Sequence, residues 1–242
     1  MHIAGSDWRF WHRVNGRGVL ERFVASGCNV AEGDVLWGRL EGDPEERVIM
    51  AHPPETTSDL SFEHWVESAV KHGHAIKVDF KTPRVIPPVL TLLADRAFYA
   101  ARLILNADVA IGPGGESPIL SVDDMRGMRR AFPEAILSLG LTTASWGGAY
   151  QAGHINMLLN AAATLGGPVT VCLRLELFLA DVSVLKPLEE ADCHVTIWND
   201  PRTFPATDET LERIRLLAPD AFIDLCASSG APVYVDEATR MN

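Results

Sequence analysis

Long hydrophobic runs are absent from this sequence, and so is a recognisable leader. No stretch approaches the ~18 consecutive apolar residues that a membrane-spanning helix needs. The first ten residues, MHIAGSDWRF, contain neither the basic region nor the apolar region of a secretory signal. We therefore expect a soluble, cytoplasmic protein with no transmembrane segment.

Positive charge is also scarce. The chain has 21 lysines and arginines against 32 aspartates and glutamates, which gives a net charge of −11. A chain this acidic has no electrostatic reason to seek nucleic acid or an anionic membrane surface. To bind a phosphorylated substrate it would need a local cation.

Two further signatures are missing. The four cysteines, Cys28, Cys172, Cys193 and Cys226, lack the CxxC spacing of a zinc site, and we expect buried thiols rather than a disulfide framework. No GxGxxG follows the first expected strand, which disfavours a dinucleotide-binding fold. The GPGG segment at 112–115 lacks the lysine of a phosphate-binding loop.

What is present is a regular alternation of short apolar runs and amphipathic stretches. The runs are rich in valine, isoleucine and leucine, which is typical of strands buried on both faces. Strands are expected near 8–12 and at 29–36, 75–80, 102–109, 135–141, 168–175, 194–199 and 221–225, and helices near 15–26, 61–73, 84–101, 122–131, 150–165, 181–191 and 208–217. This alternation predicts a parallel sheet closed into a TIM-type (β/α)₈ barrel, a fold of about 250 residues. We expect residues 1–242 to form this single domain.

Polar residues gather at the carboxyl ends of the expected strands, where barrel enzymes have their active sites. They are His12, Glu32, Asp34, Asp79, Lys81, Asn106, Asp108, Ser138, Arg174, Glu176, Trp198, Asn199 and Asp224. Charges embedded in apolar strands have to be paired or bind a metal, because burying an isolated charge is unfavourable.

Three acids predict a metal site. Glu32 and Asp34 are two residues apart on one strand, so their side chains point the same way, and Gly33 leaves room on the opposite face. A divalent cation relieves the repulsion between them, and oxygen ligands suit Mg²⁺ or Ca²⁺. Asp79 offers a third ligand, while Lys77 or Lys81 could hold a phosphate oxygen. The alternatives are an exposed acidic edge strand at 32–34 and a half-exposed strand with a solvated face at 77–81.

Two histidines are candidates for proton transfer, because histidine titrates near neutral pH. His12 ends the first expected strand, and His52 follows the apolar run VIMA and precedes two prolines. The alternative for each is a structural or exposed histidine.

Several separated segments become recognisable together. In chain order they are HRVNG (12–16), EGDV (32–35), MAHPP (50–54), IKVDFKT (76–82), LNADV (105–109), FPEAILSLGLTT (132–143) and VTIWND (195–200). Over about residues 8 to 225 the chain resembles the menorin-like family of uncharacterised domains. That family in turn resembles the phospholipase-C-like phosphodiesterase barrels, which include glycerophosphodiester phosphodiesterases and sphingomyelinase D.

The resemblance implies a metal-dependent phosphodiesterase, either a hydrolase or a cyclising lyase. Its three acids would hold Mg²⁺ or Ca²⁺. By the same analogy His12 would act as base or nucleophile and His52 as general acid, Lys81 would stabilise the phosphate, and Trp198 would form a wall of the substrate pocket. The chain departs from glycerophosphodiesterases at Val14, where glycine is usual, at Pro53, where they carry aspartate or glycine, and in having Asp79 in place of a glutamate.

The expected substrate is a small phosphodiester, such as a glycerophosphodiester or a lysophospholipid. Lys77, Asn106 and Arg174 are expected to bind it together with Trp198, and the alternative for Arg174 is an ion pair with Glu176 or another acid of the rim. Two other functions stay open: a catalytically silent barrel that binds a protein or ligand, and a metal-dependent hydrolase of another ester or amide. The sequence leaves the oligomeric state open.

Overall fold

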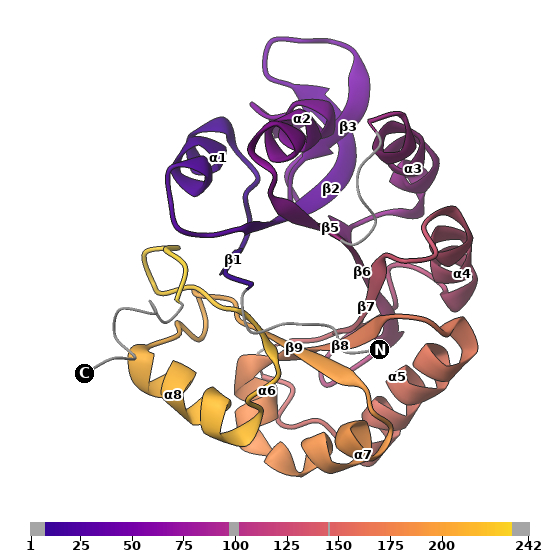
Figure 1. The fold of residues 1–242 in the computed structure, drawn as a ribbon, viewed down its shortest axis with the longest axis vertical. Helices are drawn as coiled ribbons and strands as arrows, with labels where there is room; N and C mark the ends of the chain where they lie inside the picture. The colour runs from indigo at the N-terminus through magenta and orange to yellow at the C-terminus, as the bar shows by residue number, and fades with distance from the viewer. Residues whose placement is uncertain (1–7, 97–101, 145, 234–242) are drawn as a thin grey trace.

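Eight strands form a nearly closed parallel barrel in the computed structural model, which describes residues 8–96, 102–144 and 146–233. Their bounds are β1 Phe10–Trp11, β2 Val30–Leu40, β5 Ala75–Phe80, β6 Leu103–Ile111, β7 Ile136–Thr142, β8 Val169–Arg174, β9 His194–Trp198 and β10 Phe222–Asp224. Each strand is paired in parallel with the next, and Figure 1 views the ring end-on. The prediction of a (β/α)₈ barrel is confirmed.

Helices surround the ring of strands (Figure 1). They are α1 Arg17–Val24, α2 Phe62–His72, α3 Ile86–Asp95, α4 Val122–Ala131, α5 Ala152–Leu165, α6 Leu175–Ala180, α7 Leu185–Glu190 and α8 Asp208–Leu217, with 3₁₀ turns η1 Pro83–Val85 and η3 Val182–Val184. The side chains of Ser61, Ser121 and Thr207 each accept a hydrogen bond from a backbone N–H of the following first turn, as helix caps do. The predicted helix at 84–101 is η1 followed by α3, and its residues 97–101 lie outside the described part of the chain.

Side chains alternate between the two faces of each strand, so the barrel interior is filled in layers. The lowest layer is apolar and consists of Phe10, Val30, Ala75, Ile104, Ile136 and Phe222. Two residues further along these strands the interior becomes polar, with Glu32, Lys77, Asn106, Ser138 and Asp224, all buried, and Thr196 of β9 is buried as well. The intervening residues, such as Val78, Leu105 and Leu139, are buried in the core between the strands and the helices. The apolar layer closes one end of the barrel and leaves the polar groups at the other.

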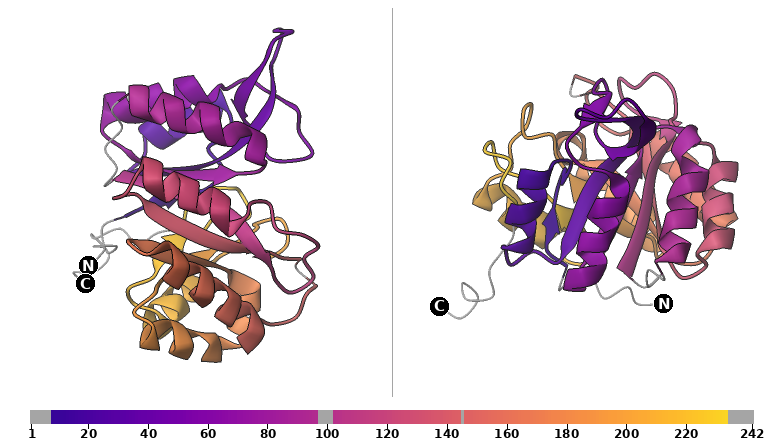
Figure 2. Two further views of the ribbon diagram at one scale, coloured as in Figure 1. Left: turned by 90° about the vertical axis from the view of Figure 1, so that its right-hand side faces the viewer. Right: turned by 90° about the horizontal axis from the view of Figure 1, so that it is seen from above.

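A β-hairpin interrupts the regular alternation. Strand β2 runs 11 residues, beyond its predicted end, and pairs antiparallel with β3 Glu46–Met50; β4 Thr57–Ser58 then adds to β2 in parallel. The hairpin projects from the barrel at the top of the left view in Figure 2. Because Met50 lies opposite Val35 in this pairing, the chain returns to the end of the barrel just before His52.

Side chains complete the ring between β1 and β10. In the described residues no backbone ladder joins these two strands. Instead the rings of Phe10 and Phe222 lie 6.0 Å apart, and His12 Nδ1 lies 3.2 Å from Asp224 Oδ1. The seam of the barrel therefore includes one of the predicted catalytic residues.

Two predicted absences can be compared with the described residues. Cys28, Cys172, Cys193 and Cys226 are all free thiols, and only Cys193 is partly exposed. None of the described helices combines the length and the apolarity needed to cross a membrane.

Candidate functional site

A cavity of about 230 Å³ opens at the carboxyl ends of the barrel strands. Every residue that the sequence marked as catalytic, metal-binding or substrate-binding lines it, on strands β2, β5, β6, β8 and β9 and in the loops that follow β1, β3 and β5. The lining residues are His12, Arg13, Glu32, Asp34, His52, Lys77, Asp79, Lys81, Asn106, Asp108, Thr143, Cys172, Arg174, Trp198, Asp200 and Arg202. His12 and His52 therefore line the same cavity.

The three predicted metal ligands converge. Glu32, Asp34 and Asp79 each offer a carboxylate oxygen, and these oxygens lie within 4.8 Å of one another. The strand pairing explains this, because Asp34 lies directly opposite Asp79 in the β2–β5 register. On the outer face of β2 a side chain at Gly33 would collide with Met50. An all-carboxylate set at this spacing fits a hard divalent cation.

Lys81 lies against two of these acids. Its ammonium is 3.0 Å from Asp34 Oδ1 and 2.6 Å from Asp79 Oδ2. Burial alone would raise the pKa of Asp34, but Lys81 and the neighbouring donors outweigh it and lower the pKa to about 2. Lys81 itself has a pKa well above its ordinary value, because the carboxylates outweigh its burial. The lysine thus supplies the positive charge that the two acids require.

The segment after β1 holds the acids of β2 in place. The Arg13 backbone N–H donates to Glu32 Oε2 at 2.7 Å, and Arg13 adopts a left-handed φ of 59°. Asn15 Nδ2 donates to Asp34 Oδ2 at 2.6 Å, while the Asp34 N–H donates to Asn15 Oδ1 at 2.9 Å. The HRVN segment therefore both presents His12 and orients two candidate ligands.

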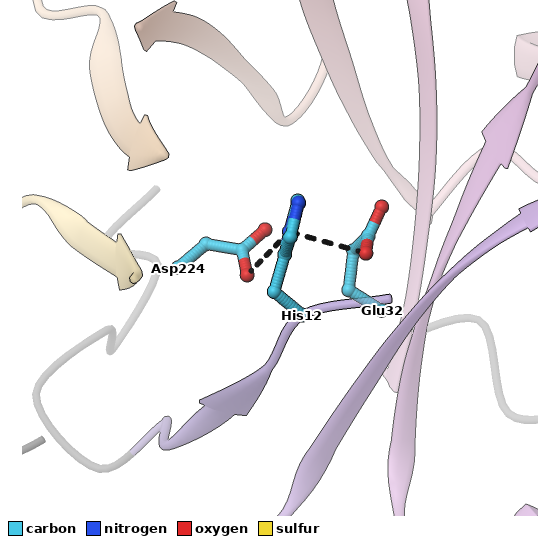
Figure 3. A group of neighbouring side chains, drawn as sticks. All are labelled: His12, Glu32 and Asp224. Carbon is cyan, nitrogen blue, oxygen red and sulfur yellow. Dashed lines mark hydrogen bonds and ion pairs between the residues drawn. The ribbon is translucent and has the colours of Figure 1, made fainter. Parts of the chain in front are cut away.

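His12 lies between two carboxylates (Figure 3). Its Nδ1 is 3.2 Å from both Glu32 Oε2 and Asp224 Oδ1, and its ring stacks against Trp198 with centroids 6.2 Å apart. Burial by itself would lower the pKa of His12, but the two carboxylates outweigh it and raise the pKa to about 9. With Nδ1 engaged, Nε2 is the ring atom left for proton transfer.

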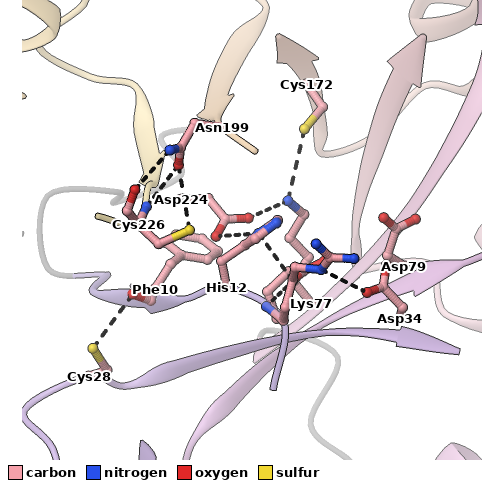
Figure 4. A network of polar contacts seen from close by, with 12 residues as sticks. Phe10, His12, Cys28, Asp34, Lys77, Asp79, Cys172, Asn199, Asp224 and Cys226 are labelled. Atoms are coloured by element: carbon pink, nitrogen blue, oxygen red, sulfur yellow. Dashed lines mark hydrogen bonds and ion pairs between the residues drawn. The ribbon is translucent and has the colours of Figure 1, made fainter. Parts of the chain in front are cut away.

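Lys77 and Asp224 form a buried ion pair beneath the cavity (Figure 4). Lys77 Nζ donates to Asp224 Oδ2 at 2.7 Å, and both side chains are almost completely buried. His12, Glu32 and Asp224 are also close enough to form a second possible metal-binding group. Because Lys77 and protonated His12 already balance its two carboxylates, we interpret this group as an ion-pair cluster.

His52 differs from His12 in its electrostatics. Its Nδ1 lies 2.6 Å from the Pro53 carbonyl oxygen and donates to it, which leaves Nε2 as an acceptor. Burial lowers the pKa of His52, and the nearby Asp34 opposes this only in part. At neutral pH the cavity thus contains one protonated and one neutral imidazole.

The protonation of His12 can be measured directly. In EDTA, an NMR titration of the His12 ring is expected to have its midpoint near pH 9, and excess Mg²⁺ should lower it, because a cation at Glu32 offsets the carboxylate charge. Because the pKa is raised on folding, this proton stabilises the fold fully below pH 6.5, and the stabilisation is lost as the pH rises through about 9. The His12→Gln variant identifies the signal. A midpoint at or below 6.5 in EDTA would contradict the assigned environment.

The residues expected to bind substrate, Lys77, Asn106, Arg174 and Trp198, also line the cavity. Arg174 pairs with Glu176 at 2.6 Å, as its alternative reading predicted, and also donates to Thr203 Oγ1 at 2.9 Å. Its guanidinium carbon lies 5.3 Å from the centre of the Trp198 ring. Asn106 is 4% exposed, and its Oδ1 has no hydrogen-bond partner among the described residues.

Three residues of the site were missed as site residues in the sequence. Asn15 holds Asp34, Asp224 contacts His12, and Asp108 lines the cavity. Burial raises the pKa of Asp108 to about 6, although Lys81 opposes the shift. The available signal was position, since Asp108 and Asp224 are among the polar residues near the expected strand ends, to which no role was given, and Asn15 lies in the HRVN segment.

Comparison with known proteins agrees with this fold. The human protein FAM151B is 32% identical over 141 residues, which are 57% of this chain and 51% of that protein, so the chain spans about half the length of this curated relative. The crystal structure of a protein from Galdieria sulphuraria, assigned as a glycerophosphodiester phosphodiesterase, is similar with a TM-score of 0.59 and 11% identity, covering 90% of this chain and 92% of that one. At this identity the likeness shows the barrel fold alone.

The most extensive match is to a domain family. The sequence profile of the menorin N-terminal domain matches residues 5–225, which include every strand of the barrel and every residue that lines the cavity. The chain therefore belongs to the menorin N-terminal domain family.

Proposed function

We propose that this protein is a phosphodiesterase that depends on a divalent cation, Mg²⁺ or Ca²⁺, and cleaves a small phosphodiester. The observation that carries the proposal is the convergence of three carboxylates, two histidines and Lys81 on one cavity of about 230 Å³. A barrel that served only as a scaffold would not need these groups together. The barrel's likeness to a protein assigned as a glycerophosphodiester phosphodiesterase supports the same reaction class by analogy.

Glu32, Asp34 and Asp79 would hold the cation. When bound there, it would neutralise the phosphate and stabilise the charge that develops on its non-bridging oxygens. Lys81 adds a second positive group beside the same oxygens. These cations would allow a chain with a net charge of −11 to accept an anionic substrate.

The two histidines would divide the proton transfers. His12 Nε2 would take the proton of the attacking hydroxyl, and His52, after taking up a proton from solvent at Nε2, would pass that proton to the leaving oxygen. For this His12 must first lose the proton that Glu32 and Asp224 favour, and engagement of Glu32 with a cation would weaken that hold. Asp224 then keeps the ring oriented through Nδ1. A substrate with a neighbouring hydroxyl could be attacked internally and yield a cyclic phosphate.

The cavity's size limits what enters it. Ligand pockets commonly measure about 300–1,000 Å³, so a cavity of about 230 Å³ suits the head group of a glycerophosphodiester or lysophospholipid, with any acyl chain outside. Trp198 and Arg174 would form one wall, and Asn106 would accept a hydrogen bond from a substrate hydroxyl. Lys77 would contribute positive charge from the floor.

The proposal is tested with purified protein and bis-p-nitrophenyl phosphate, glycerophosphodiesters and lysophospholipids, each in Mg²⁺, Ca²⁺ or EDTA. Turnover is expected that EDTA abolishes and that Glu32→Gln lowers by at least about a hundredfold, because removing one electrostatic stabiliser commonly has an effect of this size. Glu190→Gln, on the exposed face of α7, should leave the rate unchanged.

The alternatives make different predictions for the same assay. Cation binding without turnover of any substrate would support a binding module instead. Turnover confined to carboxylic esters or amides would favour another class of hydrolase. Activity that survives both EDTA and Glu32→Gln would contradict the proposed chemistry.

A further inference from the structure

Asp108 lines the cavity, but the proposed reaction gives it no role. It stands on β6, its backbone carbonyl accepts hydrogen bonds from the N–H groups of Ile119 at 2.8 Å and Leu120 at 3.2 Å, and its side chain lines the cavity. On the neighbouring strand β7, a Cβ at Gly140 would collide with Asp108 Oδ1. The absence of a side chain at position 140 thus provides the space that this carboxylate occupies.

The carboxylate of Asp108 is without a close partner. Within the described residues its side chain takes part in no ion pair and no hydrogen bond. Of the nearby cations, Lys81 lowers the pKa of the Asp108 carboxyl most, ahead of Lys77. Asp79 lies opposite Asn106 in the β5–β6 pairing, and Lys81 and Asp108 each stand two residues further along these neighbouring segments and line the same cavity. Asp108 is therefore the next carboxylate available to the Lys81 ammonium.

Lys81 presents a difficulty for cation binding. Its ammonium lies between Asp34 and Asp79, with Nζ 3.0 Å from Asp34 Oδ1 and 2.6 Å from Asp79 Oδ2. A divalent cation that takes oxygens of these acids removes the partners of Lys81 and brings two like charges together, which is unfavourable at a few ångströms in a partly buried site. Lys81 then needs another anion near its present place.

We infer that Asp108 is the positioning residue that holds Lys81 once a divalent cation has taken Asp34 and Asp79. The inference rests on the proposed cation site but not on turnover. Lys81 serves as the counter-ion of Asp34 and Asp79 before the cation binds, and Asp108 pairs with it afterwards. Binding of the cation and transfer of the lysine are then one coupled event, and Lys81 stays beside the place where the phosphate would bind.

A double-mutant cycle on cation affinity tests this without reference to activity. Mg²⁺ binding is measured by isothermal titration calorimetry at pH 8 for the wild type, Lys81→Met, Asp108→Asn and the double variant. Lys81→Met is expected to tighten binding about tenfold or more, equivalent to about 1.4 kcal/mol, because the competitor is gone. Asp108→Asn should weaken binding by a similar factor, and in the Lys81→Met background this effect should largely disappear.

Asp200→Asn provides the baseline, because Asp200 lines the same cavity but pairs with Arg202 at 2.7 Å. The residual effect of Asp108→Asn in the Lys81→Met background should not exceed this baseline. An equal loss in both backgrounds would overturn the inference, since Asp108 would then be a direct ligand or a remote charge. Unchanged affinity in Lys81→Met would overturn it as well. Gly140→Ala, which displaces the carboxylate and keeps its charge, should reproduce Asp108→Asn if that variant folds poorly.

The cycle also separates this inference from the proposed function. Coupled affinities without turnover of any phosphodiester would leave the lysine exchange standing and remove the phosphodiesterase. Turnover of a phosphodiester with uncoupled affinities would support the phosphodiesterase and overturn the lysine exchange.

Discussion

Replacing Lys77 by methionine is expected to lower the free energy of unfolding by about 3–5 kcal/mol, because it leaves a buried carboxylate without its closest counter-charge. Lys77 Nζ lies 2.7 Å from Asp224 Oδ2, and the two side chains are 3% and 0% exposed. Burial alone would raise the pKa of Asp224, but Lys77 and His12 hold it well below its ordinary value. Urea denaturation at pH 7 in EDTA measures the loss as a lower midpoint.

The matched control is Lys186→Met, because Lys186 is 80% exposed and lies 3.9 Å from Glu190. Its effect should stay within about 0.5 kcal/mol. Adding Asp224→Asn to the Lys77 variant removes the unpaired charge and should restore part of the stability. A Lys77→Met protein as stable as the wild type would mean that Lys77 and Asp224 are not paired in solution.

The second large effect concerns catalysis. His12→Gln is expected to lower kcat on an active phosphodiester by about 10²–10⁴-fold, the usual contribution of a positioned acid or base. Glutamine can still hydrogen-bond to Asp224, but it cannot exchange a proton at the position of Nε2. KM and Mg²⁺ affinity should change far less than kcat, because the carboxylates remain.

His64→Gln serves as the control, since His64 lies on the exposed face of α2, outside the cavity. It should retain full activity. If His12→Gln kept more than about a tenth of the wild-type kcat, a loss below the usual range for an acid or base, the assigned role of His12 would be wrong.

The barrel was predictable because its determinants are local. Parallel strands buried on both faces give short apolar runs, and a helix start such as Ser121 with Asp124 carries its cap within four residues. The alternation of Glu32 and Asp34 on β2, and of Lys77, Asp79 and Lys81 from β5 onward, also fixed which side chains share the inner face. The convergence of the candidate ligands followed from that geometry.

The remaining features depend on contacts that no short pattern contains. Asp224 contacts His12 from 212 residues away along the chain, at a seam whose strands share no ladder. The β2–β3 hairpin was missed because β2 simply continues past its expected end at residue 36 as a mixed apolar and polar run. The acid that each lysine pairs with could not be predicted either, since Lys77 in β5 and Lys81 just after it lie four residues apart on the same face, with Asp79 between them.

The contact between β1 and β10 involves the same histidine to which we assign proton transfer. Within the described residues backbone pairing leaves this junction open, and a hydrogen bond between the His12 imidazole and Asp224 spans it beside the contact of the Phe10 and Phe222 rings. We therefore expect a fluctuation that separates these two strands to break this hydrogen bond and displace the imidazole. The junction without a backbone ladder thus contains the proposed catalytic imidazole, and we expect the local stability of the β1–β10 contact to limit how long His12 keeps its orientation.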